Sequence, residues 1–354
     1  TTARRRAIDR LRQRKLHHER QEALAYELEQ ADMAAPDSDA WLEDDIGDDL
    51  LRLVFIACHP VLPTEARVAL TLRLLGGLST DEIARAFLQS EATIAQRIVR
   101  AKRTLAKKQV AFEVPRKSEL DERLDSVLEV IYLVFNEGYS ASTGDDWMRP
   151  ALCDEALRLG RQLAGLMPGE TEVLGLLALM ELQASRTKAR MDGRGNPVLL
   201  LEQNRARWDH LQIARGLAAL ERASGLGGAQ QPYALQAAIA ACHARARQAA
   251  DTDWVRIAAL YAALANVMPS PVVELNRAVA QGMAYGPEAG LALVEALADD
   301  PALRDYAPLP AVRGDLLQKL GRHEEARAEF ERAAGLTLNA RTRALMLARA
   351  LACH

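Results

Sequence analysis

The sequence predicts an all-helical protein, and two observations support this fold class. Aromatic residues make up only 5% of the 354 residues, whereas alanine, leucine, arginine and glutamate are abundant. These side chains lose little rotamer freedom in a helix. Apolar residues also recur at helical spacing along most of the chain. The apolar content of 49% is enough for an ordinary core, and the length allows two or three domains.

The composition also restricts the compartment and the cofactors. No apolar run reaches the roughly 18 residues that cross a bilayer, and the Arg-rich beginning lacks the apolar segment of a signal peptide. We therefore expect a cytoplasmic protein with no membrane partner. The cysteines at positions 58, 153, 242 and 353 are far apart and form no CxxC pair. No disulfide framework, metal site or other cofactor is expected.

The charges are distributed unevenly although the net charge is only −3. Residues 1–20 contain eight Arg or Lys and two acids, residues 21–50 contain eleven acids and no Arg or Lys, and residues 93–108 contain six Arg or Lys and no acid. The apolar periodicity disappears around residues 34–39, as is typical of a solvated linker. The pattern predicts the end of one domain at 1–20 and an acidic linker at 21–45.

Residues 46–112 have the pattern of a helix-turn-helix domain. Two helices are expected first, one ending before Pro60 and the next closing at the glycine pair 76–77. Ser79 and Glu82 form an S-x-x-E capping box in front of a short helix. Ser90 is the expected N-cap of a longer helix. That helix has one apolar stripe, formed by Ile94, Ile98, Ala101 and Leu105.

The face opposite this stripe predicts a DNA contact. It carries Thr93, Gln96, Arg97, Arg100, Arg103 and Lys107. Arginine pairs with guanine edges or phosphates, and glutamine pairs with adenine. Side chains near the start of a recognition helix lie deepest in the major groove. The alternative is a solvated cationic helix face with no ligand.

The remainder of the chain predicts a helical-repeat domain. After a short linker at 113–120, residues 121–354 form a succession of Ala- and Leu-rich helical segments. The small and aromatic residues Gly314, Ala326, Phe330 and Ala333 follow the spacing of a tetratricopeptide repeat of about 34 residues. Small residues let paired helices approach closely, and stacked pairs bury a common core. We therefore expect a tetratricopeptide-like fold here.

Several segments resemble a known family. Residues 78–87, 90–93 and 97–103 resemble the fourth domain of bacterial RNA polymerase sigma factors, which reads the promoter −35 element. Residues 3–12 are similar to the helix that closes the second sigma domain. The resemblance implies that Arg4, Arg5, Arg6 and Arg10 contact DNA on the −10 side. Because the upstream helices of that domain are missing, we expect a truncated protein.

Residues 48–60 and 132–140 resemble the extracytoplasmic-function subgroup that carries a long tetratricopeptide-like extension. The resemblance implies a helix-turn-helix sigma domain followed by a tetratricopeptide-like helical-repeat domain, with core RNA polymerase and promoter DNA as partners. The short tether at 113–120 keeps the two domains at high local concentration. We therefore expect the repeat domain to regulate activity or to bind a protein regulator.

Two segments of the repeat domain are candidates for a protein interface. Their residues are Phe135, Asn136, Glu137, Tyr139, Arg190 and Arg194. The first four lie next to an apolar helical run, and the alternative is that they only end a helix at Gly138. The other two lie in a turn-forming insertion at 186–209, where charged loops are often simply solvated.

The alternatives to a sigma factor are a conventional DNA-binding regulator and an enzyme. A conventional helix-turn-helix regulator with a peptide- or ligand-sensing repeat domain would bind DNA without acting as a polymerase subunit. An enzyme is not expected, because no nucleophile with its base, phosphate loop or metal spacing is present in the sequence.

Overall fold

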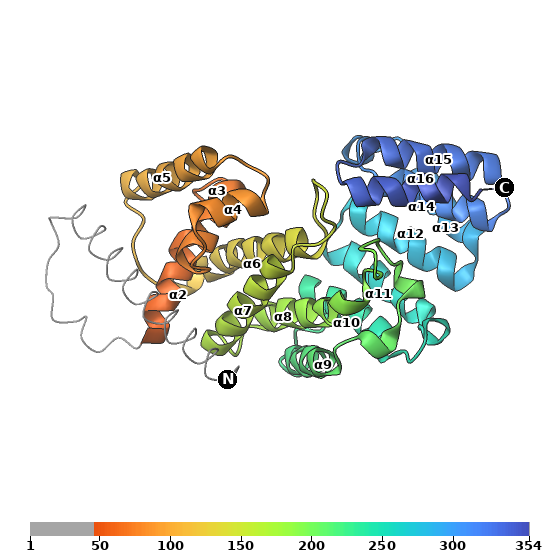
Figure 1. The fold of residues 1–354 in the computed structure, drawn as a ribbon. Helices are drawn as coiled ribbons and strands as arrows, with labels where there is room; N and C mark the ends of the chain where they lie inside the picture. The colour runs from red at the N-terminus through yellow and green to blue at the C-terminus, as the bar shows by residue number, and fades with distance from the viewer. Residues whose placement is uncertain (1–45, 354) are drawn as a thin grey trace, which may run out of the picture. The chain divides into compact units, whose positions relative to one another are not determined.

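The structure, a computed structural model, describes residues 46–353, whose fold is made of helices and the segments that connect them (Figure 1). No strand forms in this range, where only the isolated bridges Gly144–Asn339 and Met191–Pro197 occur. The predicted all-helical class, with a helix-turn-helix followed by a helical domain, is confirmed. No helix within these residues is long and apolar enough to cross a membrane. The chain divides into two compact units between Val127 and Leu128.

The described part of the first unit contains four helices and the beginning of a fifth. They are α2 (Ile46–Ala57), α3 (Thr64–Leu74), α4 (Thr80–Ala86), α5 (Glu91–Lys107) and α6 (Lys117–Tyr139). Phe55, Leu70, Ile83 and Ile94 are almost completely buried, and they come from α2 to α5 in turn. Helix α2 ends before Pro60, as the sequence predicts. Gly77 follows α3 with a φ of 66°, a left-handed conformation that glycine adopts without strain.

The predicted linker at 113–120 is shorter in the structure, because α6 begins at Lys117. Glu119 lies in its first turn, where a carboxylate interacts favourably with the helix dipole. The N-terminal half of α6 is then held to the first unit by side chains. Arg123 donates to the carbonyl of Phe55 at 3.0 Å, and Ser126 Oγ donates to the carbonyl of Cys58. The unit boundary therefore falls inside a helix and not in a loop.

The second unit is formed by the rest of α6 and ten further α-helices. They are α7 (Pro150–Leu166), α8 (Thr171–Ala184), α9 (His210–Gly225), α10 (Pro232–Arg245), α11 (Trp254–Val267), α12 (Pro271–Tyr285), α13 (Pro287–Ala296), α14 (Pro308–Lys319), α15 (His323–Leu336) and α16 (Ala340–Leu351). Most pack against the helix that follows them in the chain (Figure 1). Five begin with proline, which fits a first helical turn because the missing N–H has no intrahelical acceptor there.

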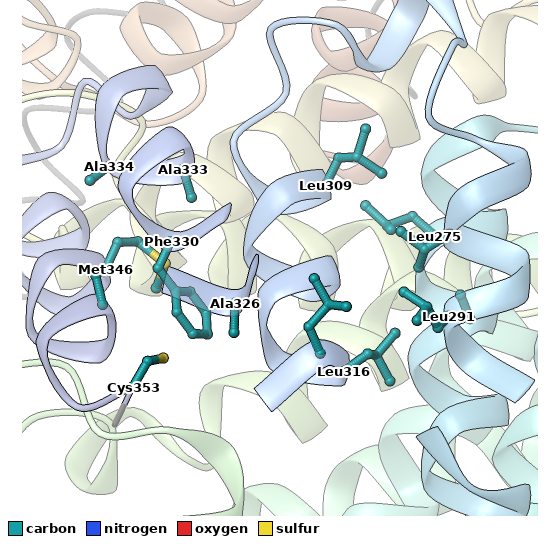
Figure 2. Close-up of a cluster of buried hydrophobic side chains, with 14 of the residues drawn as sticks. Leu275, Leu291, Leu309, Leu316, Ala326, Phe330, Ala333, Ala334, Met346 and Cys353 are labelled. Atoms are coloured by element: carbon teal, nitrogen blue, oxygen red, sulfur yellow. The ribbon is translucent and has the colours of Figure 1, made fainter. Parts of the chain in front are cut away.

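The C-terminal helices share a hydrophobic core centred on Phe330. Met346 lies beside this ring, which has no exposed surface, whereas Leu316 lies on the side of the core near Leu291 (Figure 2). Gly314 of α14 lies against it, and a Cβ atom there would be 3.0 Å from the nearest ring carbon. Ala326, four residues before Phe330, is also fully buried. The small residues predicted from the repeat pattern thus lie where two helices approach closely.

Candidate nucleic-acid interface

The capping box that the sequence predicts forms at the start of α4, and a tight turn joins the end of α4 to α5. The backbone nitrogen of Ser79 donates to Glu82 Oε2 at 2.7 Å, and the Glu82 nitrogen donates to Ser79 Oγ at 3.1 Å. At the other end of α4, the Gln89 nitrogen donates to the carbonyl of Ala84 at 2.9 Å. Leu88 has a φ of 51°, an uncommon left-handed conformation for leucine. This residue turns the chain so that α5 starts three residues later.

The apolar stripe of α5 is buried as the sequence predicts. Its four members are Ile94, Ile98, Ala101 and Leu105, with exposed fractions from 1% to 9%. They pack against α3 and α4, which contact α5. Since the helix repeats every 3.6 residues, burying this stripe directs the opposite face outward.

The outward face of α5 is basic. Gln96, Arg100, Arg103 and Lys107 are exposed, whereas Thr93 and Arg97 are half-buried. Within the part of the chain that the structure describes, no carboxylate forms an ion pair with the arginines of this face or with the lysine. Their charges therefore stay available to phosphate groups, which supply most non-specific affinity for DNA.

Val99 is an exposed apolar residue beside this face that the sequence analysis did not select. Its side chain is 45% exposed. It lies three residues after Gln96 and four before Arg103, so it neighbours both on the helix surface. Apolar side chains in this position can contact the methyl group of thymine. A helical projection of residues 91–107 would have shown Val99 next to the basic face.

The residues predicted on the −10 side lie outside the described residues. Arg4, Arg5, Arg6 and Arg10 therefore stay a prediction from the sequence.

The candidate interface residues of α6 are mostly packed within the second unit. Phe135 has no exposed surface and stacks on Tyr139, with ring centroids 5.6 Å apart. Asn136 is half-buried. Glu137 forms an ion pair with Arg149 in which both side chains are less than 15% exposed. The burial of Phe135 and the ion pair of Glu137 hold this end of α6 in the fold. Little of the Phe135 or Glu137 side chain is therefore left for a partner.

Arg190 and Arg194 differ in their surroundings. Arg190 is 6% exposed and donates to the carbonyl of Tyr139. Its guanidinium lies between two rings, 3.4 Å from the centroid of Tyr139 and 4.4 Å from that of Trp147. Burial lowers the pKa of Arg190 to about 10. Arg194 is exposed in a turn closed by Asp192, so only this member of the pair is at the surface.

No group of three or more histidines, cysteines or acids among residues 46–353 is arranged to hold a metal ion. The four cysteines are free and buried. Burial raises the pKa of the Cys153 thiol to about 12, so this thiol is protonated at neutral pH.

Comparison with known proteins finds family models that match the helix-turn-helix and the start of the second unit. The family model described as "Sigma-70, region 4" matches residues 52–105, which include α3, α4 and nearly all of α5. The model described as "Family of unknown function (DUF6596)" matches residues 123–224, from α6 into α9. An uncharacterized protein of Rhizobium meliloti (strain 1021) is 49% identical over 293 residues, covering 83% of this chain and 69% of that protein. The chain therefore belongs to the family of the Rhizobium protein, and its sigma-70 region 4 domain supports a role as a sigma factor or DNA-binding transcription protein.

Proposed function

We propose that the protein is a sigma factor of the extracytoplasmic-function type, which directs core RNA polymerase to specific promoters in the cytoplasm. One observation carries the proposal: the region 4 match coincides with a helix-turn-helix whose second helix presents a basic face that no carboxylate of residues 46–353 pairs with. A region 4 domain implies core RNA polymerase and promoter DNA as partners. The extracytoplasmic-function subgroup is inferred from the sequence resemblance of residues 48–60 and 132–140.

Helix α5 reads the −35 element in this account. Thr93, Gln96 and Arg97 lie in its first two turns, the part of a recognition helix that enters the groove most deeply. Arg100 follows Thr93 by seven residues, or about 10 Å along the helix axis. The major groove is about 12 Å wide, so these residues reach both base edges and the flanking backbone.

The side chains of the α5 face have different roles. Thr93 is partly engaged, because its hydroxyl lies 2.7 Å from Ser90 Oγ. Gln96 is free to pair with adenine, and the longer side chains of Arg97 and Arg100 reach guanine or phosphate. The exposed residues farther along the helix, Arg103 and Lys107, suit the phosphate backbone.

The remaining parts of the proposal come from the sequence. Residues 1–20, with Arg4, Arg5, Arg6 and Arg10, contact DNA on the −10 side, and residues 21–45 form the acidic linker between the two DNA-binding domains. The second unit is a tetratricopeptide-like domain that regulates activity or binds a protein regulator. The close approach of Gly314 to Phe330 supports this fold, because such repeats need small residues between paired helices.

In vitro transcription with core RNA polymerase and the full-length protein tests the proposal. The templates are a genomic fragment library, and the transcripts are sequenced from their 5′ ends. A sigma factor gives transcripts with a shared upstream element that core polymerase alone does not produce. A conventional regulator would bind DNA in a parallel pull-down yet give no new start sites with core polymerase, and that result would overturn the proposal.

A further inference from the structure

The second unit contains a series of arginines and aromatic rings that the proposed DNA contact does not use. Its members alternate in space in the order Trp147, Arg190, Tyr139, Arg186, Trp208 and Arg205. They come from the end of α6, the connection to α7, and the segment between α8 and α9. We call this set the arginine–aromatic cluster.

Arg186 lies at the centre of this cluster. The carbon of its guanidinium is 5.7 Å from the ring centroid of Tyr139 and 5.9 Å from that of Trp208. Arg205 lies over the same Trp208 ring at 4.8 Å. Arg186 is half-buried. Guanidinium groups within about 6 Å of a ring are attracted to its π face, yet such contacts leave their N–H groups free for acceptors.

The three arginines have no acidic partner among the described residues. The ion pairs in this unit that join an arginine to a carboxylate more than ten positions away all lie elsewhere among the described residues: Arg149–Glu137, Arg161–Glu181, Arg313–Glu329 and Arg349–Asp315. The pKa of Arg205 is lowered by burial and by the neighbouring charge of Arg186, and Asp251 offsets this only in part. Within the described chain, the cluster therefore carries positive charge that no carboxylate compensates, and it is partly buried.

Buried donors without partners occur in the same place. Trp208 is 4% exposed, and its Nε1 has no hydrogen-bond acceptor within the described chain. The same holds for Nε of Arg205, whose Nη1 donates to the carbonyls of His243 and Ala246 and whose Nη2 donates to Thr252 Oγ1 at 3.2 Å. Native proteins rarely leave such donors unpaired. Burial, together with Arg186 and Arg205, lowers the pKa of His243 to about 4, so the imidazole is neutral near pH 7.

We propose that the arginine–aromatic cluster binds the oxyanion of a ligand, a carboxylate or a phosphate group. Arg186 is the accessible cation, Arg205 adds charge, and Trp208 Nε1 is a neutral donor. An oxyanion supplies both missing features, because it compensates clustered guanidinium charges and accepts several N–H bonds at once. The competing account is a purely structural stack in which cation–π contacts alone stabilise the connection between α8 and α9.

Indole NMR of the full-length protein tests the site directly. Tryptophan is labelled with ¹⁵N, the Trp208 resonance is assigned with Trp208→Phe, and the protein is titrated with sodium phosphate, sodium succinate or sodium chloride at equal ionic strength. We expect a saturable shift of the Trp208 resonance with phosphate or succinate and none with chloride. The oxyanion that saturates identifies the ligand chemistry.

Two variants control the titration. Arg186→Gln should weaken oxyanion binding by about tenfold or more, because it removes a charge-assisted contact. Arg327→Gln alters an exposed arginine paired with Glu331 outside the cluster and should bind like the wild type. Titrations that never saturate, or an Arg186→Gln affinity equal to the wild type, would overturn the proposal.

Thermal unfolding with and without phosphate separates a binding site from a structural stack. A binding site predicts that saturating phosphate raises the Tm of the wild type and raises that of Arg186→Gln by much less, because a ligand stabilises the folded state that binds it. A structural stack predicts the same response to phosphate in both proteins, and that result would contradict the proposal. Neither experiment uses DNA or polymerase, so failure here would leave the role of α5 unaffected.

Discussion

The side-chain oxygen of Ser90 accepts a hydrogen bond from the backbone nitrogen of Thr93 at 3.1 Å, at the first turn of α5. Ser90 itself has extended backbone angles, with φ −72° and ψ 148°, so it ends the turn and caps the helix. This contact fixes the residue at which α5 begins. It therefore determines which side chains lie on the outward face, including Gln96 and Arg100.

Loss of the cap should loosen the start of α5. Ser90→Ala leaves the Thr93 nitrogen without its acceptor and is expected to cost about 1 kcal/mol. Ser90→Asp keeps an acceptor and serves as the matched control. Amide exchange at Thr93 and Ile94 measures the effect, with faster exchange expected in the alanine variant only. Equal exchange in both variants would show that the cap does not hold this turn.

Alanine substitutions at two helical glycines should change the free energy of unfolding in opposite directions. A Cβ at Gly138 would lie 2.6 Å from the backbone nitrogen of Cys153, whereas a Cβ at Gly165 meets nothing within 4 Å. Gly138→Ala should therefore force α6 and α7 apart and cost about 1–3 kcal/mol or more. Gly165→Ala should stabilise α7 by about 0.5–1 kcal/mol. Urea unfolding followed by circular dichroism measures both, and a destabilised Gly165→Ala would contradict the reasoning.

The ion pair between Glu137 and Arg149 should matter more than an exposed pair. Both side chains are less than 15% exposed, so Glu137→Gln leaves a buried guanidinium without its charge partner. Such losses typically cost about 3–5 kcal/mol. The control is Glu331→Gln, which removes a partner of Arg327 in a pair more than half exposed and should cost less than about 1 kcal/mol. Similar unfolding free energies for the two variants would refute this ranking.

Acid should destabilise the second unit through His243. Its pKa is about 4 in the folded protein because of burial and the charges of Arg186 and Arg205, against an ordinary value of 6.5. Between these values the unfolded chain binds more protons, so the stability is complete above pH 6.5 and is lost as pH falls toward 4. The loss at pH 5 should be about 2 kcal/mol.

The matching variant is His243→Gln, which does not titrate in this range. It should flatten the dependence of the unfolding free energy on pH between pH 7 and 5. An unchanged pH slope in this variant would mean that other groups account for the acid sensitivity.

The sequence predicted the helix-turn-helix well because its signals are local. The S-x-x-E box, the Ser90 cap and the stripe from Ile94 to Leu105 each involve residues within a few turns of one another. The surroundings of Arg190 were harder to predict, because in the sequence this residue is one of several charges in a turn-forming insertion. Its contact with Tyr139 spans 51 positions, and no local pattern contains that information.

The same limit applies to the start of α6 and to the arginine–aromatic cluster. Residues 117–120 have too few apolar positions to distinguish a linker from a helix, and Arg123 and Ser126 fix α6 through contacts 68 positions away. Arg186 and Trp208 meet because the segment between α8 and α9 folds back. That no carboxylate of residues 46–353 forms an ion pair with the arginines of this cluster follows from the three-dimensional structure and not from any local pattern.

DNA binding by α5 variants tests the central claim most directly. Duplexes are first selected from a random pool by the wild-type protein with core RNA polymerase, and affinities are then measured by fluorescence anisotropy at fixed salt. Arg97→Ala and Arg100→Ala should each weaken binding by about 1–3 kcal/mol if the side chain contacts a base, whereas the exposed control Arg327→Ala should not. Wild-type affinity in both α5 variants would contradict the assignment of α5 as the promoter-reading helix.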